Sequence, residues 1–502
     1  MDNFTIGFGI GSGVAQRPQQ PSVRLPAVAG QFYPAQPGEL VAMVDNCLAE
    51  APISTETVGT VRAMICPHAG YKFSGKAAAA NFKLLKPNQF ARVIVIGPSH
   101  YHRFRGASVP NYSAFRTPLG DVPVDRAACA ALRRCSAVND DLAAHGREHS
   151  IEVELPFLQR TLGQFQLVPI VTGEMQRAGQ AALAEALAPL WDERTLLVAS
   201  SDFCHYGPNF RFQPFGTGEH DRIANLDASA LDQIQALNPT GFAANVALTH
   251  NTICGHVAIG QLLALASRAG GLRATQTSYY MSGDLFSDYQ NSVSYASVVF
   301  SDGGHAAVES NRNLSEEEQK VLLREARASV EQAVIHRDHT PKVASRSAGS
   351  LPDKFLRAGA AFVTLTRKAD GQLRGCRGSI VPLEPLIYSI RRSAIEAAVQ
   401  DPRFAPVAPD ELPGLDLEIN VLHPPQLVRG IEDFVLGKHG LILSVEDRRG
   451  LFLPEVMTRQ NWSPEETLAH LCNKAGVHPQ AWRNGYTLYT FETQAFGENH
   501  HG

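Results

Sequence analysis

The chain has little cysteine, no long apolar run and no excess of positive charge. Its 502 residues include eight cysteines and no CxxC pair, so neither a disulfide framework nor a zinc-ribbon spacing is indicated. No apolar stretch approaches the roughly 18 residues of a membrane span, and residues 1–17 lack the basic-then-apolar pattern of a secretory signal. The formal net charge of −4 argues against nucleic-acid binding by bulk charge. We therefore expect a reduced, cytoplasmic protein with no membrane or nucleic-acid partner.

The composition is that of a globular protein with more than one domain. Hydrophobic residues make up 44% and charged residues 19%, and the length predicts two or three domains. A polar, glycine-containing segment at residues 301–313 has the composition of a linker. Directly after it, Ser315 and Glu318 have the spacing of a capping box, which predicts the start of a helix. We expect one domain over residues 24–300 and a second over 314–496.

The two domains differ in their hydrophobic patterns. Short β-branched runs alternate with helical stretches in the first domain, as in an α/β sandwich with a parallel or mixed sheet. In the second, apolar and polar residues alternate over 415–421, which indicates a half-exposed strand. Helices are expected over 386–399 and 464–475, so we predict a smaller α+β domain with an antiparallel sheet. The expected strands of the first domain are Val61–Cys66, Val93–Ile96, Leu167–Val171, Leu196–Ala199 and Ser294–Phe300.

Three of these strands are followed by a histidine. His68, His100 and His205 each come just after a strand, beside Gly, Pro or Ser. Because ligands of open α/β sheets bind beyond the carboxyl ends of the strands, we expect the three imidazoles to meet at one rim. Cys254 precedes an apolar helix over 257–266, which Asn251 or Thr252 could cap. Its thiolate would be favoured by the helix dipole.

Two kinds of chemistry could use these groups. Two imidazoles and a thiolate can bind a metal ion and leave coordination positions open. Alternatively, Cys254 with His205 or His100 could form a nucleophile–base pair for acyl transfer. The ligands are far apart in the sequence, so their spacing leaves both alternatives open.

Several segments are similar to two known families. The first domain resembles the Memo family and the second resembles the AMMECR-type domain; together the resemblances span nearly the whole chain. Fusions of this kind belong to the AmmeMemoRadiSam system, which implies a radical-SAM protein as a partner. The Memo-like segments are Arg24–Tyr33, Cys66–Gly75, Ile96–His100, Glu148–Glu152, Ser200–His205 and Asn251–Gly255. The AMMECR-like segments are Leu373–Gly378, Asp401–Phe404, His439–Leu441, Leu453–Val456 and Lys474–Gly476.

The Memo resemblance implies a fold like that of class III extradiol dioxygenases, which cleave aromatic rings with Fe(II) and O₂. It implies that His68, His100 and Cys254 bind the metal, and that His205 acts as acid or base with Asp202 beside it. The dioxygenases have a carboxylate where this chain has Cys254. The resemblance makes Fe(II) the expected metal. Because a thiolate is softer than a carboxylate, copper and zinc are alternatives.

Further residues are expected near the substrate or around the metal ligands. In the first domain these are His149, Glu148, Tyr71 and Asp284. In the second domain Arg374, Cys376 and Arg377 are expected in a loop that faces the first domain, where the guanidinium groups could hold a carboxylate or phenolate of the substrate.

The resulting hypothesis is an iron-dependent dioxygenase of the extradiol type that acts with O₂ on a catecholic or related aromatic molecule. A non-catalytic copper- or iron-binding redox or interaction protein is one alternative. A cysteine hydrolase that uses Cys254 is another. A homo-oligomer is compatible with each hypothesis.

Overall fold

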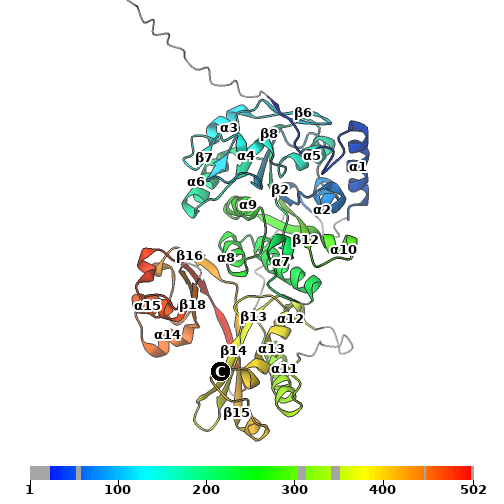
Figure 1. The fold of residues 1–502 in the computed structure, drawn as a ribbon. Coiled ribbons are helices and arrows are strands. Elements are labelled where there is room, and N and C mark those ends of the chain that lie inside the picture. The colour runs from blue at the N-terminus through cyan, green and yellow to red at the C-terminus, as the bar shows by residue number, and fades with distance from the viewer. Residues whose placement is uncertain are drawn as a thin grey trace, which may run out of the picture.

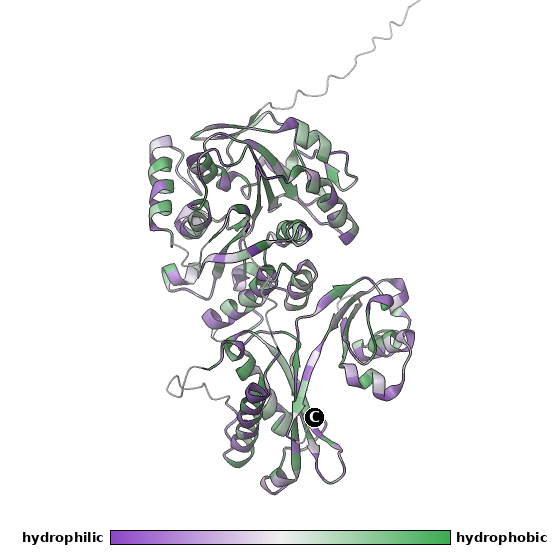
Figure 2. Cartoon of the chain, turned by 180° about the vertical axis from the view of Figure 1, so that it is seen from behind, coloured by the Kyte–Doolittle hydropathy of each residue, from purple (hydrophilic) through white to green (hydrophobic). Residues whose placement is uncertain are grey.

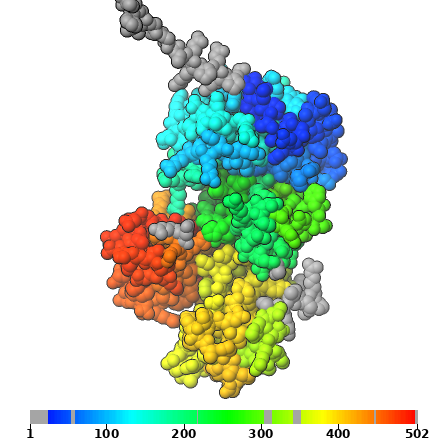
Figure 3. Space-filling view, viewed as in Figure 1, coloured from blue at the N-terminus to red at the C-terminus, as the bar shows by residue number. Residues whose placement is uncertain are grey.

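A computed structural model describes residues 23–52, 58–216, 218–302, 313–340, 351–445 and 448–498 of the chain. An N-terminal part lies above a C-terminal part, and the C-terminal part is divided into two lobes (Figures 1 and 3). The N-terminal part is a mixed α/β sandwich and the C-terminal part contains antiparallel sheets. The fold class expected from the sequence is therefore confirmed.

A nine-stranded mixed sheet forms the centre of the N-terminal part. Its four middle strands are parallel, in the order β2–β9–β3–β8, and β12 and β4 run antiparallel to the strands at either end of this group. The parallel arrangement brings the carboxyl ends of β2, β3 and β9 to one edge. The strands of this sheet are β2 (Val61–Cys66), β3 (Arg92–Pro98), β4 (Ala107–Ser108), β7 (Val138–Asn139), β8 (Gln166–Thr172), β9 (Thr195–Ser200), β10 (His205–Tyr206), β11 (Leu272–Met281) and β12 (Ser292–Asp302).

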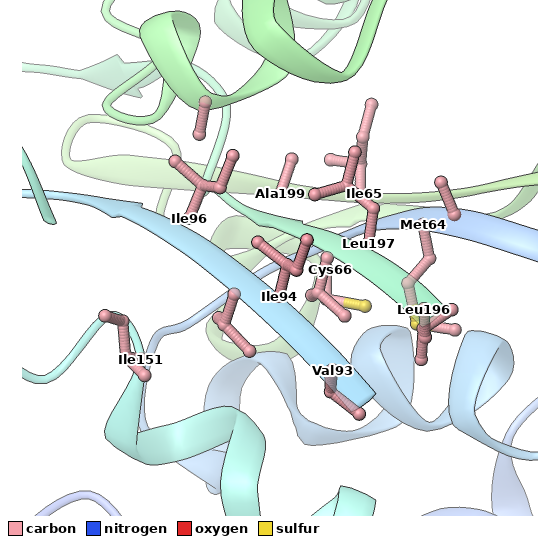
Figure 4. Packing of buried hydrophobic residues seen from close by; sticks show 14 of the residues in the cluster. Met64, Ile65, Cys66, Val93, Ile94, Ile96, Ile151, Leu196, Leu197 and Ala199 are labelled. Atoms are coloured by element: carbon pink, nitrogen blue, oxygen red, sulfur yellow. The ribbon is translucent and has the colours of Figure 1, made fainter. Parts of the chain in front are cut away.

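Helices cover both faces of this sheet. Figure 4 shows the apolar side chains of the middle strands packed between helices on either side, and they are almost fully buried. Burial on both faces explains why these strands are nearly continuous runs of apolar residues. A small sheet of β1 (Val23–Arg24), β5 (Ala114–Thr117) and β6 (Gly120–Pro123) lies apart. The helices of this part are α1 (Pro37–Glu50), α2 (Tyr71–Phe82), α3 (Arg126–Leu132), α4 (Ala143–Gly146), α5 (Leu155–Leu162), α6 (Arg177–Leu187), α7 (Glu219–Gln235), α8 (Pro239–Thr249), α9 (His256–Ala269) and α10 (Ser282–Phe286).

The C-terminal part contains two four-stranded antiparallel sheets. In the first lobe the strand order is β14–β13–β15–β20, and α11 and α13 pack against one face of the sheet. In the second lobe the strand order is β16–β19–β17–β18, and α14 and α15 accompany this sheet. In Figure 2 hydrophobic residues lie mainly on the strands, and hydrophilic residues lie mainly on the outward sides of the helices. The strands are β13 (Ala360–Arg367), β14 (Leu373–Gly378), β15 (Leu415–Leu422), β16 (Gln426–Val428), β17 (Gly440–Val445), β18 (Arg448–Phe452), β19 (Thr487–Phe491) and β20 (Thr493–Gly497). The helices are α11 (Glu316–Ile335), α12 (Asp353–Leu356), α13 (Leu386–Val399), α14 (Pro454–Gln460) and α15 (Pro464–Ala475).

The start of α11 follows the capping box expected from the sequence. The main-chain N–H of Glu318 donates to Ser315 Oγ (3.3 Å), and Ser315 N–H donates to the Glu318 carboxylate (2.7 Å). The linker expected over 301–313 needs a correction at its first residues. Ser301 and Asp302 belong to β12, because Ser301 pairs with Val61 and the N–H of Asp302 donates to Thr60. Residues 303–312 lie outside the described part of the chain.

The two parts are joined by contacts on α8. Ala244 and Leu248 of this helix pack in one apolar cluster with Ile442 and Tyr489 of the second lobe. Arg449, on β18, donates hydrogen bonds to the carbonyls of Ala247 and Leu248 at the end of α8.

Among the helices in the described part of the chain, none combines the length and the apolar character that crossing a membrane requires.

Candidate metal centre

His68 lies in the turn after β2, at the carboxyl edge of the central sheet. Its main-chain N–H donates to Asp202 Oδ1 (2.8 Å), and its Nδ1 lies 2.8 Å from Ser200 Oγ. Ser200 donates its own proton to the Ser150 carbonyl (2.6 Å) and can therefore accept from Nδ1–H of His68. This arrangement leaves Nε2 of His68 with a free lone pair, as a metal ligand requires. Burial lowers the pKa of His68 well below its usual value, so its ring is neutral.

His100 follows β3 and is held by Glu148. Its Nδ1 donates to Glu148 Oε1 (2.9 Å) and its main-chain N–H donates to Oε2 (2.6 Å). Burial would raise the pKa of Glu148, but the hydrogen bond from His100 outweighs it and lowers the pKa to about 2. An ionised carboxylate that orients a histidine through Nδ1 is a common support for metal ligands.

Cys254 lies before α9 rather than in its first turn. The helix begins after Gly255, where a Cβ would come within 2.5 Å of the Ser200 carbonyl oxygen, so the loop lies directly against the end of β9. Asn251 and Thr252 do not cap the helix: Asn251 donates to Asp227, and Thr252 Oγ1 accepts from the N–H of His205. Burial raises the pKa of Cys254, and hydrogen bonding with His100 opposes this effect.

The structure brings His68, His100 and Cys254 together. One donor atom from each lies within 4.8 Å of the others, and Cys254 Sγ is 3.2 Å from His68 Nε2. The two rings meet edge to face, with centroids 5.1 Å apart. Two imidazole nitrogens and one sulfur at this spacing fit a first-row transition metal and leave coordination positions open.

His205 lies beside these three residues, at the start of β10. Its Nδ1 is 2.9 Å from the Phe203 carbonyl and 3.1 Å from the Thr252 carbonyl. Because both partners only accept, Nδ1 carries the proton and Nε2 has the free lone pair. His205 is half-buried, so this nitrogen is positioned to exchange a proton with a bound molecule.

Asp202 lies against the turn that carries His68, within electrostatic reach of His205. Its carboxylate accepts from the main-chain N–H of His68, and it is 5% exposed. It therefore holds the turn that carries a proposed ligand, which is a positioning role.

Aromatic rings surround the open side of the centre. His149 stacks on His100 with centroids 4.5 Å apart, and Phe32 lies 4.7 Å from His149. Tyr101, half exposed, lies 5.8 Å from His149, and Phe210 lies 5.3 Å from His205. Burial lowers the pKa of His149 to about 4, so the stacked ring is neutral. The surroundings of the centre suit a flat apolar molecule.

Two residues expected near the substrate lie elsewhere. Tyr71 is buried at the start of α2, where its hydroxyl donates to the Val153 carbonyl (2.6 Å) and its ring packs on Phe157. Asp284 accepts from the N–H of Met281 and from the Tyr289 hydroxyl, both at 2.7 Å, at the start of α10. Tyr71 is bound in the core and Asp284 caps a helix, so neither side chain reaches the centre.

The expectation that Arg374, Cys376 and Arg377 form a loop facing the first domain is wrong. All three lie on β14, which pairs with β13 in the sheet of the first lobe. Figure 1 shows β14 in the lower part of the molecule, with α7 and α8 between it and β2. The guanidinium of Arg374 is used within its own lobe, since it donates twice to Glu411 at 2.8 and 2.9 Å.

Sequence reasoning considered Glu152 near the pocket but missed Arg24, Ser200 and Glu154, which also support the centre. Arg24 and Glu152 form a buried ion pair, and Arg24 also donates to the Glu148 carbonyl. Glu152 accepts in addition from two main-chain N–H groups of the N-terminal segment. Ser200 and the buried Glu154 lie 2.8 Å apart behind His68. Two glutamates within an otherwise apolar run, at positions 152 and 154, were the available signal, because a buried carboxylate needs partners.

Two family models match the chain. Residues 24–299 match the family described as Memo-like protein, and residues 323–496 match AMMECR1. A MEMO1 family protein of Methanopyrus kandleri, MK0963, is 34% identical over 292 residues, which cover 56% of this chain and 99% of that protein. The memo-1 homolog of Caenorhabditis elegans is 33% identical over 287 residues, 54% of this chain and 80% of that protein.

One solved structure is also similar in sequence. It is the uncharacterised protein PH0010 of Pyrococcus horikoshii, which is 32% identical to this chain. The match covers 37% of this chain and 94% of that chain, with a TM-score of 0.34.

Proposed function

The chain belongs to the family of Memo-like proteins, and we propose that its N-terminal part is an iron-dependent dioxygenase of the extradiol type. The substrate would be a catecholic or related aromatic molecule, which reacts with O₂. The observation that carries the proposal is the convergence of donor atoms from His68, His100 and Cys254 within 4.8 Å, beside the free Nε2 of His205.

The surrounding hydrogen bonds support a metal at this place. Glu148 and Ser200 occupy Nδ1 of His100 and His68, respectively, so both rings present Nε2 to the centre. A metal ion would also favour the thiolate of Cys254, whose pKa burial raises in its absence. Fe(II) held by these residues would supply the redox chemistry between O₂ and the aromatic ring.

The other residues of the centre would bind and deprotonate the substrate. The ring would pack beside His149 and Tyr101, and Phe32 would exclude water behind them. His205 would accept a phenolic proton at Nε2, while its Nδ1–H stays bound to two carbonyls that fix the orientation of the imidazole.

Anaerobic purification followed by metal analysis tests the proposal. We expect about one iron per chain in the wild-type protein and in His102→Ala, and none in His68→Ala. His102 is a matched control, because it pairs with Asp141 and belongs to no group of metal donors in the described part of the chain. We also expect oxygen uptake with at least one member of a panel of catechols. An iron-free active protein, or an iron-loaded protein that consumes no oxygen with any catechol, would contradict the proposal.

The thiol favours a second candidate, a copper- or iron-binding redox protein without turnover of an aromatic. Thiolate and imidazole together are donors that copper prefers. Bound copper, reversible oxidation and no oxygen uptake would support this candidate. A cysteine hydrolase is the third: the donor atoms of Cys254 and His100 lie within 4.8 Å of each other, and hydrogen bonds with Cys254 and Glu148 outweigh burial and raise the pKa of His100 to about 10, so a nucleophile and a neighbouring imidazole are present. Activity that survives a chelator would indicate the hydrolase.

A further inference from the structure

Three buried glutamates follow one another in the segment 148–154, and their partners differ. Glu148 accepts a hydrogen bond from His100, and Glu152 forms an ion pair with Arg24. Glu154 is 1% exposed, and no ion pair joins it to a cation in the described part of the chain. Because an ionised carboxylate in the interior needs a cation or several donors, the charge of Glu154 depends on what its hydrogen-bond partner can offer.

The hydrogen-bond partner of Glu154 is Ser200, at the end of β9. Its Oγ lies 2.6 Å from the Ser150 carbonyl oxygen, and 2.8 Å from both Nδ1 of His68 and Oε1 of Glu154. A hydroxyl group has one proton to donate and two lone pairs that accept. The carbonyl can only accept, so it takes the Ser200 proton, and the other two partners must donate. Glu154 can donate only when its carboxyl group is protonated.

The surroundings also favour the neutral acid. Burial raises the pKa of Glu154 well above its usual value; the hydrogen bond with Ser200 opposes this effect, and the nearby carboxyl of Asp202 adds to it. The thiol of Cys66 and the hydroxyl of Tyr71 are within electrostatic reach and supply no positive charge, because burial raises the pKa of both groups as well. A proton on Glu154 therefore avoids an uncompensated buried charge.

We infer that Glu154 is a neutral carboxylic acid that positions His68 through Ser200, an inference that rests on the proposed role of His68 as a metal ligand. The acid donates to Ser200 Oγ, and this hydroxyl donates onward to the Ser150 carbonyl and accepts from Nδ1–H of His68. The proton and both lone pairs of the hydroxyl are then used, which holds Ser200 as an acceptor and leaves Nε2 of His68 for the metal.

The two proposed histidine ligands consequently have different support. His100 donates to the ionised carboxylate of Glu148, and such a partner makes an imidazole a stronger donor to a metal. His68 donates to a hydroxyl inside a neutral chain of hydrogen bonds. Removal of a charge should therefore matter behind His100, whereas behind His68 only the hydrogen bond should matter.

Infrared spectroscopy of the full chain tests the protonation of Glu154. The carbonyl stretch of a protonated carboxyl is separate from the bands of carboxylates, and it shifts in D₂O. The difference between the wild type and Glu154→Gln, both freed of metal with a chelator at neutral pH, should show the loss of a protonated carboxyl. Glu148→Gln is the matched control, because its difference spectrum should show the loss of a carboxylate. A carboxylate band lost in Glu154→Gln would overturn the inference.

Competition for Zn²⁺ with a chelator tests the positioning role. Glu154→Met removes the donor and should weaken Zn²⁺ binding about tenfold, the lower end of the usual effect behind a metal-binding histidine. Glu154→Gln should restore the affinity, because an amide N–H donates to Ser200 as the acid does. Equal losses in the two variants, or no loss in Glu154→Met, would overturn the inference. The infrared band and the Glu154→Gln affinity decide it even where Glu154→Met does not fold.

Neither measurement uses iron or oxygen. Failure of the proposed dioxygenase would appear in the iron content and the oxygen uptake, with the infrared band and the Zn²⁺ affinities as expected. Failure of this inference would appear in the band and in these affinities alone.

Discussion

The carboxylate of Glu148 holds both the ring and the main chain of His100. One oxygen accepts from Nδ1 (2.9 Å) and the other from the main-chain N–H (2.6 Å). The first oxygen also accepts from the N–H groups of His149 and Ser150. A single side chain thereby fixes the position, the rotation and the tautomer of one proposed ligand.

We expect Glu148→Gln to weaken metal binding about 10- to 100-fold, the usual effect of losing a carboxylate behind a metal-binding histidine. The amide cannot accept from both N–H groups of His100 as strongly as the carboxylate. Competition with a chelator of known affinity measures the change. Glu185→Gln, at an exposed ion pair with Arg268, is the control and should bind as the wild type does. Equal affinities for all three proteins would show that Glu148 only stabilises the fold.

His205→Ala should keep its metal and lose turnover by about 10²- to 10⁴-fold, the range for a general acid or base. His205 is bound through Nδ1 to two carbonyls, so its Nε2 is free for substrate. Metal content and oxygen uptake, measured on one preparation, separate the two effects. If this variant lost as much metal as His68→Ala, His205 would be a ligand and the proposed division of roles would be wrong.

The pair of Arg374 and Glu411 predicts a pH dependence of stability. Hydrogen bonding from Arg374 lowers the pKa of Glu411 from the usual 4.5 to about 2. Because the folded pKa is depressed, this contribution is fully present above about pH 4.5 and is lost as the pH falls through 2. Arg374→Met should cost about 2 kcal/mol at pH 7 and flatten the pH dependence between 4.5 and 2.

Urea unfolding at several pH values measures both effects. Arg377→Met is the control, because Arg377 is partly exposed and lies 3.9 Å from Glu396. The metal content of both variants should be that of the wild type, since β14 lies far from the centre. A loss of metal in Arg374→Met alone would indicate that the first lobe of the C-terminal part contributes to the metal centre.

Arg449→Ala should loosen the loop that carries Cys254. Arg449 donates to the carbonyls of Ala247 and Leu248, in the last turn of α8, and this helix leads directly into the loop. Hydrogen exchange of residues 248–254 should become faster. The neighbouring Arg448→Ala is the matched control, because Arg448 donates to Gly476 within the second lobe. Equal exchange in the two variants would mean that the contact between the two parts does not stabilise the loop.

Local structure was determined largely by the sequence. The limits of β2, α13 and α15 agree with the expected ranges 61–66, 386–399 and 464–475, and the capping box at Ser315 begins α11. Such features depend on periodicity and on partners a few residues away. The positions of His68, His100 and His205 after strands are local in the same sense.

Tertiary structure decided which of these residues meet and what holds them. Cys254 lies 3.2 Å from His68 across 186 positions of sequence, and Glu148 binds His100 from a separate loop. Arg374 resembled a ligand-binding residue by its neighbours in the sequence, but the packing of its lobe pairs it with Glu411. Partners of this kind depend on strand order, sheet register and loop conformation, which no local pattern encodes. The sequence therefore determined the donor groups, and only the fold determined their arrangement into a centre.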